Sequence, residues 1–402
     1  MTAPLEGIRV LDLTQGVTGP FATKHFSDYG AEVVKVERPG RGDLSRRLGP
    51  FPGDRPNLER SGMFLTLNTG KQSVTLDLKT ATGQQILRRL AEDADIVVES
   101  FRPGTLERLG LGPDVLREVN PRATLVRISN FGQSGPYREF DADDMLMYAM
   151  GGVLAVTAGE GREPVKIGLY APLFLAGNVV SAFMMGAFFS ARRRGLGERA
   201  DISIHEVLAG SMDRGGTNLV SYGYSGALYF EPRQPQRSSA LPAGVYPCLD
   251  GYIHILCQLQ WWPRFCKLIE RPDLENDDYL SPNLLDINYA PEVDAIFFPW
   301  LLQRTKQEAM EAGQAVGLPI AAINTMRDVL NDPQLNARAF FVDIEHPEAG
   351  HVRLPGVPLR MSGTPGELRR APLLGEHTFQ VLTERLGYDA EDVARLEQQG
   401  VI

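Results

Sequence analysis

The first 130 residues alternate between strand-like and helix-like stretches, and this alternation constrains the fold more than any other feature of the chain. Residues 8–13 form a short apolar run that ends in Thr14-Gln15-Gly16, residues 20–29 have a helical pattern, and residues 31–37 form a second apolar run. Two strands joined by a helix within about 30 residues are typical of a βαβ unit, and such units build parallel sheets. The sequence therefore predicts an α/β fold.

Further elements are expected in the same half of the chain. Apolar runs predict strands at residues 95–99, 125–129 and 200–204, and an amphipathic pattern predicts a helix at residues 82–93. Residues 64–67 and 73–78 flank Asn68-Thr69-Gly70-Lys71, which favours a hairpin. Asp141, Asp143 and Asp144 precede a helical pattern, and aspartates at such a position are typical helix caps.

Residues 169–190 carry no charge and are followed by three arginines, Arg192, Arg193 and Arg194. Length and flanking charge both fit a membrane span. However, a proline, two glycines and polar side chains interrupt the run, and a single span here would put two globular halves on opposite sides of a membrane. We therefore predict a helix that is buried all round in the core.

The composition changes after about residue 222, where a polar, proline-containing loop begins. Residues 245–255 read as two strands around a turn at Asp250-Gly251, and a last helix is expected near residues 391–399. We predict a large domain formed first by residues 1–222, an inserted small α/β domain of residues 223–325, and a return to the large domain in residues 326–402.

The charge balance bears on the ligand. The chain has 41 Lys and Arg against 50 Asp and Glu, a net charge of −9, which argues against nucleic acid as the main partner. An anionic ligand therefore needs a local basic patch. Single basic residues are typical of a solvated surface, but a cluster at predicted strand ends and loops favours a pocket for a phosphate-bearing ligand. The cluster comprises Lys35, Arg38, Arg41, Arg46, Arg47, Lys71, Arg102 and Arg108.

The sequence lacks the patterns that are typical of several other classes of protein. Three cysteines without a CxxC pair, and six histidines without metal-ligand spacing, argue against a disulfide framework and a metal site. The loop Gln15-Gly16-Val17-Thr18-Gly19-Pro20 lacks the GxGxxG spacing of dinucleotide sites, and no GxSxG elbow occurs. Residues 1–9 lack the apolar core of a signal peptide, so we expect a cytoplasmic protein.

A series of longer motifs resembles the family III CoA-transferases. The resemblance covers nearly the whole chain and keeps its motifs in order. It rests on residues 5–13, on Gly30-Ala31-Glu32-Val33-Val34-Lys35-Val36-Glu37-Arg38-Pro39, on residues 68–78, on Phe101-Arg102-Pro103-Gly104 and residues 108–110, on residues 132–137, and on residues 250–252, 317–319, 332–334 and 374–377.

The resemblance implies an architecture and a ligand. It implies a Rossmann-like large domain with a small inserted domain, and two protomers threaded through one another as interlocked rings. Coenzyme A, as a substrate and without another cofactor, is expected against the large domain. By position, Gln15, Gly16 and Val17 would line its thioester end, whereas Arg38, Lys71, Phe101 and Arg108 would hold its nucleotide and pantetheine.

The resemblance also implies a nucleophile that this sequence lacks. The family's chemistry uses one aspartate, whose carboxylate attacks the acyl-CoA thioester, and the corresponding position here is Leu173. No Asp or Glu occurs between Val165 and Gly197, so a small shift of alignment does not supply one. We therefore assign no catalytic residue to this chain.

Three functions remain open. The chain is a CoA-transferase subunit whose related, aspartate-bearing partner supplies the nucleophile, an arrangement implied by resemblance to the two-subunit succinyl-CoA:benzylsuccinate CoA-transferases. Alternatively, it is a homomeric acyl-CoA enzyme with changed chemistry, although the His–Asp pair of the related racemases would fall at Asp143 and Leu173. The third possibility is a CoA-binding protein without catalysis. We favour the first.

Overall fold

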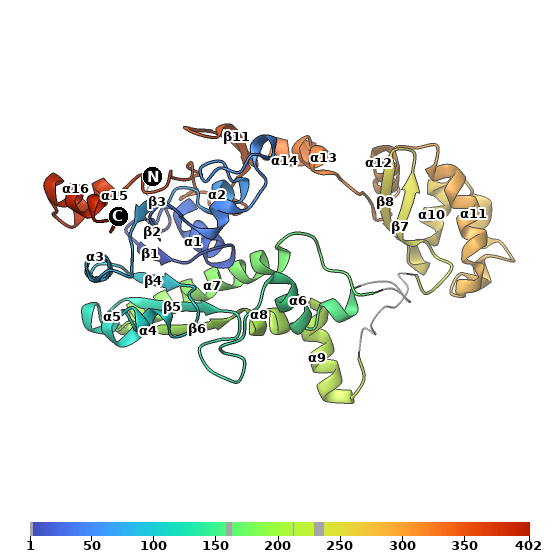
Figure 1. Cartoon of the computed structure of the whole chain (residues 1–402). Coiled ribbons are helices and arrows are strands. Elements are labelled where there is room, and N and C mark those ends of the chain that lie inside the picture. The colour runs from blue at the N-terminus through green and yellow to red at the C-terminus, as the bar shows by residue number, and fades with distance from the viewer. Residues whose placement is uncertain (1–2, 158–162, 212, 229–236) are drawn as a thin grey trace. The chain divides into compact units, whose positions relative to one another are not determined.

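The computed structural model describes residues 3–157, 163–211, 213–228 and 237–402 (Figure 1). Contacts divide the chain into two compact units. The first contains the described residues of Met1–Thr157, Pro164–Phe230 and Ala337–Ile402, and the second contains those of Ala158–Glu163 and Glu231–Asn336. The first unit is thus built from both ends of the chain, and the second from a segment in between.

A six-stranded parallel sheet forms the centre of the first unit. Its strand order is β3-β2-β1-β4-β5-β6, and every neighbouring pair is parallel. This is the order of doubly wound folds, in which successive strands are added on one side of β1 up to β3 and on its other side from β4 onward. The predicted α/β fold with a parallel sheet is confirmed. The strands are β1 (Arg9–Leu13), β2 (Glu32–Glu37), β3 (Gln72–Thr75), β4 (Ile96–Glu99), β5 (Thr124–Ser129) and β6 (Arg199–Ser203).

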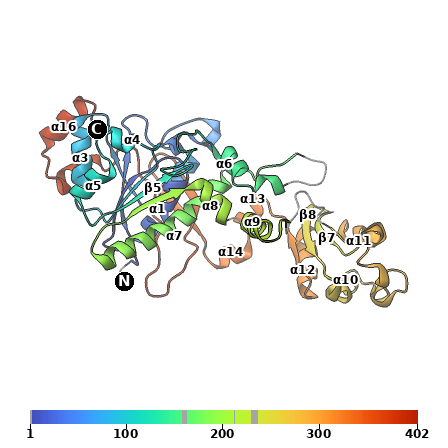
Figure 2. The ribbon, with the colours of Figure 1, turned by 90° about the horizontal axis from the view of Figure 1, so that it is seen from below.

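Helices cover both faces of this sheet (Figure 2). Because side chains alternate along a strand, Leu11 and Val97 lie in the core on one face, whereas Val10 and Ile96 lie in the core on the other. The first face is covered by α3 (Ala81–Ala91), α4 (Thr105–Arg108), α5 (Pro113–Val119) and α16 (Ala390–Gln398). The second is covered by α1 (Thr18–Asp28), α6 (Asp144–Met150), α7 (Ala171–Arg194) and α8 (Ile204–Ser211), and α9 (Asp213–Ser225) follows.

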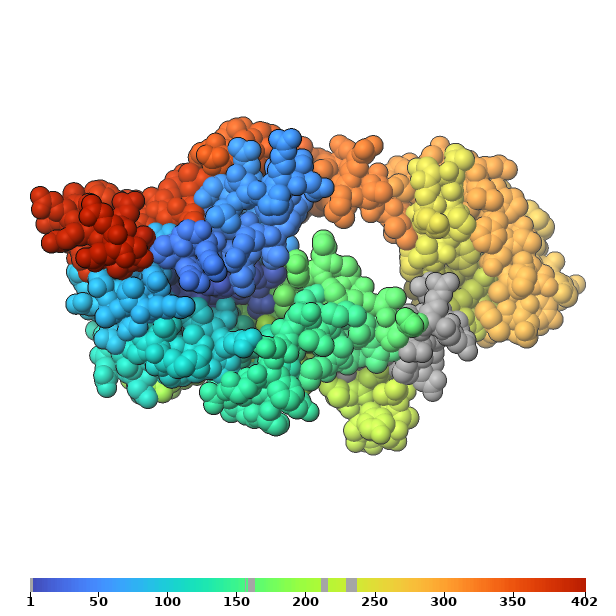
Figure 3. All heavy atoms as spheres, in the orientation of Figure 1, coloured from blue at the N-terminus to red at the C-terminus, as the bar shows by residue number. Residues whose placement is uncertain are grey.

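The C-terminal segment packs onto the start of the chain. Val381, Leu382 and Leu396 join the core that contains Leu87 of α3, and the Asp77 N–H donates to the carbonyl of Val401 at 2.7 Å. Figure 3 shows these red C-terminal residues against the blue and cyan residues of the early chain. This segment contains the hairpin β10 (Phe341–His346) and β11 (Gly350–Pro355), then α15 (Thr378–Gln380).

The hairpin predicted around residues 68–71 is wrong. Residues Gly62–Leu67 form the helix α2, and β3 pairs in parallel with β2. The helix begins at Ser61, whose hydroxyl oxygen accepts a hydrogen bond from the Phe64 N–H at 3.1 Å. A four-residue apolar run has no clear period, so the serine cap was the signal that distinguished helix from strand.

The expectation that α7 is buried all round is also wrong. Its buried residues Pro172, Ala176, Val180, Met184 and Phe188 recur every four positions and form one stripe against the sheet layer. Elsewhere the helix is open, since Phe183 is 61% and Phe189 is 56% exposed. By length and composition α7 is apolar enough to cross a membrane, but only 28% of its most apolar stretch is buried. A uniformly apolar sequence does not reveal which face packs.

The second unit has its own sheet and core. Strands β7 (Ala243–Cys248) and β8 (Gly251–Leu256) form the predicted hairpin around Asp250, and β9 (Ile320–Ala322) extends it. Trp262 and Phe265 are 3% and 0% exposed and belong to this core. The helices of this part are α10 (Trp262–Leu268), α11 (Ala290–Leu301), α12 (Lys306–Ala315) and α13 (Met326–Leu330), followed by α14 (Pro333–Ala337).

Candidate active site

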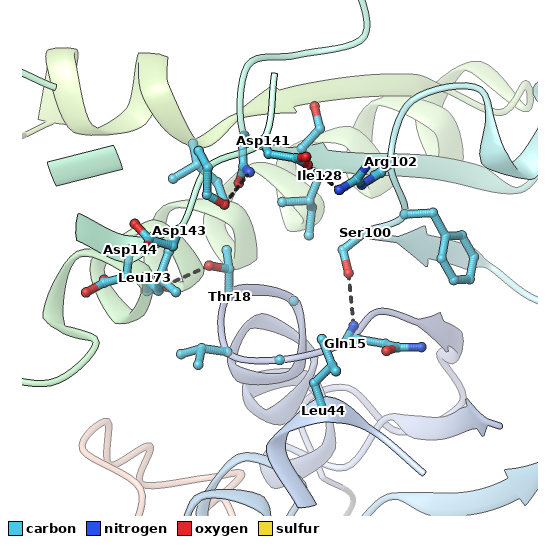
Figure 4. Close-up of a pocket in the computed structure, with 18 of the residues that line it drawn as sticks. Gln15, Thr18, Leu44, Ser100, Arg102, Ile128, Asp141, Asp143, Asp144 and Leu173 are labelled. Carbon is cyan, nitrogen blue, oxygen red and sulfur yellow. Dashed lines mark hydrogen bonds and ion pairs between the residues drawn. The ribbon is translucent and has the colours of Figure 1, made fainter. Parts of the chain in front are cut away.

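A cavity of about 610 Å³ opens at the carboxyl ends of β1, β4 and β5. These ends flank the point where the strand order reverses, which is where open α/β sheets bind ligands. The two loops that meet there are directly connected, because the Gln15 N–H donates to the Ser100 hydroxyl oxygen at 2.9 Å (Figure 4). The position of the cavity therefore follows from the topology of the sheet.

Four of the seven residues expected at coenzyme A line this cavity: Gln15, Gly16, Val17 and Phe101. Gly16 has φ +82°, a left-handed conformation that favours glycine and turns the chain from β1 into α1. The cavity thus brings together the three residues expected at a thioester and Phe101, one of the four residues expected at the nucleotide and pantetheine.

Arg38, Arg108 and Lys71 lie outside the cavity lining. The Arg38 side chain is exposed just beyond β2. Arg108 is also exposed, and its Nη2 donates to the hydroxyl of Thr105 at 2.8 Å. Both remain accessible to a ligand that extends from the cavity. Lys71, in contrast, is buried.

Lys71 is buried, with 2% of its surface exposed. Its ammonium group lies 3.1 Å from the Oδ2 of Asp12, and both side chains are fully buried. Burial alone would raise the pKa of Asp12, but the neighbouring ammonium groups of Lys35 and Lys71 and two threonine hydroxyls hold it well below its usual range. The remaining partners of the Lys71 Nζ are the Pro20 carbonyl, the Thr23 hydroxyl and the Asn68 amide oxygen.

We expect Lys71→Ala to destabilise the fold by about 3–5 kcal/mol, because it breaks a buried ion pair beside a carboxylate that stays charged. Urea unfolding measures this loss. The matched control is Lys79→Ala at an exposed lysine, which should change the free energy of unfolding by less than about 0.5 kcal/mol. Unchanged stability together with weaker coenzyme A binding would instead show that Lys71 reaches the ligand.

Other cations line the cavity. They are Arg47, Arg102 and Arg138, and the first two belong to the basic cluster seen in the sequence. Arg102 forms an ion pair with Asp141, and Arg138 lies 3.1 Å from the Oε1 of Glu139; these pairs are largely exposed. Arg138 was not predicted, although it directly follows the motif at residues 132–137.

An aromatic group lies beside these cations. Phe140 lines the cavity and stacks on Tyr137 with ring centroids 4.9 Å apart, and Phe131 packs edge-on against both rings. Tyr137 and Phe140 are 43% and 55% exposed. Accessible aromatic faces next to arginines suit a ligand that combines a flat ring with phosphates.

Leu173 lines the other end of the cavity, together with Thr18, Asp143 and Asp144 (Figure 4). The Thr18 hydroxyl donates to the Leu173 carbonyl at 3.2 Å, which ties the start of α7 to the start of α1. Asp143 caps α6, as predicted, by accepting from the Leu146 N–H at 2.9 Å. Asp144 is buried and ion-paired with Lys166. The side chain at position 173 is therefore at the site but brings no reactive atom.

Metal ligands do not gather in the described parts of the chain. Within residues 3–157, 163–211, 213–228 and 237–402, no three His, Cys, Asp or Glu side chains form a group that could hold a metal ion.

The fold and this cavity define an α/β protein with a ligand site at its strand ends, and the sequence places it in a family. Residues 5–378 match the model of CoA-transferase family III, and the chain belongs to this family.

Relatives of known activity align over almost the full length. The chain is 32% identical over 404 residues to the succinyl-CoA–D-citramalate CoA-transferase of Chloroflexus aurantiacus, covering 99% of this chain and 98% of the relative. It is 30% identical over 402 residues to the human succinyl-CoA:glutarate CoA-transferase, covering 99% and 90%. The crystal structure of a CAIB/BAIF family protein from Brucella suis superposes with a TM-score of 0.85 at 28% identity, covering 96% of this chain and 100% of that one.

Proposed function

We propose that this chain is a subunit of a CoA-transferase that moves coenzyme A from an acyl-CoA to a carboxylic acid, with a related subunit supplying the nucleophile. The observation that carries the proposal is Leu173. It lines the cavity at the strand ends, at the position where the family resemblance implies an aspartate, and it can neither attack a thioester nor transfer a proton. The rest of the cavity is lined by the Gln15-Gly16-Val17 loop, by Phe101 and by three arginines other than the expected ones, and these groups suit coenzyme A.

The proposed transfer uses a carboxylate as its nucleophile. The partner's aspartate attacks the thioester carbonyl, coenzyme A leaves as the thiolate, and a mixed anhydride forms. The thiolate then attacks the aspartyl carbonyl and releases the first acid, which leaves an enzyme-bound thioester. The second acid attacks that thioester, which releases the coenzyme A thiolate and forms a second mixed anhydride. The thiolate then attacks the acyl carbonyl of the second acid, which gives the new acyl-CoA and restores the aspartate.

The surface of the first unit supports a tightly associated partner. Large apolar side chains on α6, α7 and α9 are exposed, which is unusual for a protein that functions as a monomer. They include Leu146 at 49%, Phe183 at 61%, Leu219 at 59%, Val220 at 72% and Tyr224 at 93% exposed. A related chain with the same fold, threaded through this one as the family resemblance implies, would cover such faces.

The relatives suggest the first donor to assay. Both the Chloroflexus and the human relative are named for succinyl-CoA, and their acceptors, D-citramalate and glutarate, differ. We therefore propose succinyl-CoA as the donor to assay first and leave the acceptor acid open.

We also propose a reducing compartment, the cytoplasm. Cys248, Cys257 and Cys266 are free and buried in the second unit. Burial raises the pKa of Cys257 and Cys266 to about 12, so these thiols remain protonated and slow to oxidise.

Co-expression with an aspartate-bearing homologue tests the proposal. We expect the two chains to co-purify and the complex to bind coenzyme A in calorimetry. An aspartate-bearing homologue encoded next to this chain would be the first one to use. Failure of the complex to bind coenzyme A would remove the cavity as its site, and failure to associate would remove the partner.

A homomeric enzyme with changed chemistry is the second candidate, and one observation favours it. Asp143 and Asp144 line the same end of the cavity as Leu173, so two carboxylates are present near the place of the absent one. A covalent adduct on either of them in a purified homo-oligomer would establish this alternative. Coenzyme A binding without turnover in any assembly would establish the third possibility, a non-catalytic protein.

A further inference from the structure

A buried ion pair contacts the backbone of the loop that lines the cavity. The Nζ of Lys35 donates to the Thr14 carbonyl at 2.8 Å, and the Gly16 N–H donates to the Oδ1 of Asp43 at 3.1 Å. The same two side chains contact each other, since the Lys35 Nζ lies 2.7 Å from the Asp43 Oδ2. The pair therefore forms hydrogen bonds with the backbone on both sides of Gln15.

Both side chains are fully buried, which makes the pair costly unless every polar atom has a partner. The Oδ1 of Asp43 also accepts from the N–H and the hydroxyl of Ser45, each at 2.7 Å. Burial alone would lower the pKa of Lys35, but the neighbouring Asp12 and Asp43 carboxylates raise it, so the ammonium stays charged. The pair is thus charged, and each of its side chains makes further hydrogen bonds beyond the ion pair itself.

The backbone contacts of the pair indicate a role in fixing the loop. Buried ion pairs contribute little net stability compared with apolar residues of similar size. This pair instead holds two backbone groups of the loop, the carbonyl of Thr14 and the N–H of Gly16. Asp12 and Ser100 hold the N–H groups of Thr14 and Gln15, so the pair is one of several contacts that fix the loop.

We infer that Lys35 and Asp43 are positioning residues, which set the geometry of the Gln15-Gly16-Val17 loop for the thioester end of coenzyme A. This inference rests on the proposed function, because it requires that coenzyme A binds in this cavity. It assigns a role in ligand binding to two side chains that do not line the cavity.

A series at position 43 tests the inference in the full chain, in the assembly in which it is purified. Asp43→Ala removes both the charge and the acceptor for Gly16, and we expect coenzyme A affinity to fall by roughly tenfold or more. Asp43→Asn restores an acceptor oxygen at that place and should recover part of the affinity. Calorimetry at a temperature where every variant is folded measures binding, and urea unfolding measures stability separately.

A second buried pair provides the matched control. Lys24 and Asp28 form an ion pair on α1 with side chains 9% and 3% exposed, and no hydrogen bond described for them reaches the loop. Lys24→Met should lower stability but leave the affinity of the folded protein for coenzyme A unchanged. A purely structural role for Asp43 would give the same result as this control.

The outcomes separate the inference from the proposed function. If the wild type does not bind coenzyme A, the proposed function fails. If the wild type binds and the Asp43 variants bind equally well, only the inference is overturned. Should neither Asp43 variant fold, Ser45→Ala removes one hydroxyl that orients the carboxylate, and its affinity is expected to fall in the same direction. Equal affinity in that variant would also overturn the inference.

Discussion

Purified without a partner, this chain is expected to transfer no coenzyme A from succinyl-CoA to any carboxylic acid, whereas co-expression with an aspartate-bearing homologue is expected to give transfer. The physical reason is the apolar side chain of Leu173, which lines the cavity in which we propose that the thioester is attacked. Thioester consumption and acyl-CoA formation, followed by chromatography, measure the reaction. The difference in transfer rate between the two preparations should be large, because tighter substrate binding does not replace a missing nucleophile.

Variants in the complex locate the nucleophile. Changing the partner's aspartate to alanine should reduce transfer by on the order of a thousandfold or more, as expected when a covalent catalyst is removed. The control is Leu173→Asn in this chain, which should leave most of the activity. Hydroxylamine cleavage or borohydride trapping during turnover should label the partner and leave this chain unlabelled.

A robust turnover by a homo-oligomer of this chain, with a covalent adduct on one of its own residues, would contradict this expectation. Asp143 and Asp144 would then be the first residues to change, because they lie at the same end of the cavity as Leu173 (Figure 4).

The place of the cavity depends on the strands, which the sequence predicts, and on their order in the sheet, which the structure supplies. Apolar runs at residues 8–13 and 95–99 predict β1 and β4, and ligands bind at the carboxyl ends of such strands where their order reverses. The glycine in the first loop marks that edge, and the structure brings Gln15 and Gly16 to it. Local sequence predicted the strands and the loop between them, whereas the expectation that Gln15, Gly16 and Val17 line a coenzyme A site came from the family resemblance and stays a prediction.

The role of individual cations was not predictable in the same way. Lys71 follows a glycine in a loop and reads as an accessible phosphate ligand, but its ammonium pairs with Asp12, 59 residues earlier. Whether a lysine faces solvent or a buried carboxylate depends on long-range packing, which the residue type does not reveal. The same holds for α7, whose uniformly apolar sequence hid the single stripe that packs against the sheet.

Leu173→Asp is expected to give this chain CoA-transferase activity of its own. The substitution restores a carboxylate at a position that is already fixed, because the Leu173 carbonyl accepts from the Thr18 hydroxyl at 3.2 Å. Position 173 lies in the first turn of α7, where the positive end of the helix dipole stabilises a negative charge and keeps the carboxylate ionised. Aspartate is also smaller than leucine, so the cavity accommodates it.

The expected change is from undetectable transfer to measurable transfer by the chain alone, with succinyl-CoA as donor and a hydroxylamine-sensitive adduct at position 173. The stability cost should be about 1–2 kcal/mol, since one partly buried apolar side chain is lost. Leu173→Asn is the matched control, because it has the same shape and polarity without a nucleophilic carboxylate, and it should stay inactive. If Leu173→Asp folds and binds coenzyme A but forms no adduct, more than the nucleophile is missing from this cavity. The chain would then contribute coenzyme A binding only, and catalysis would take place at the partner's site.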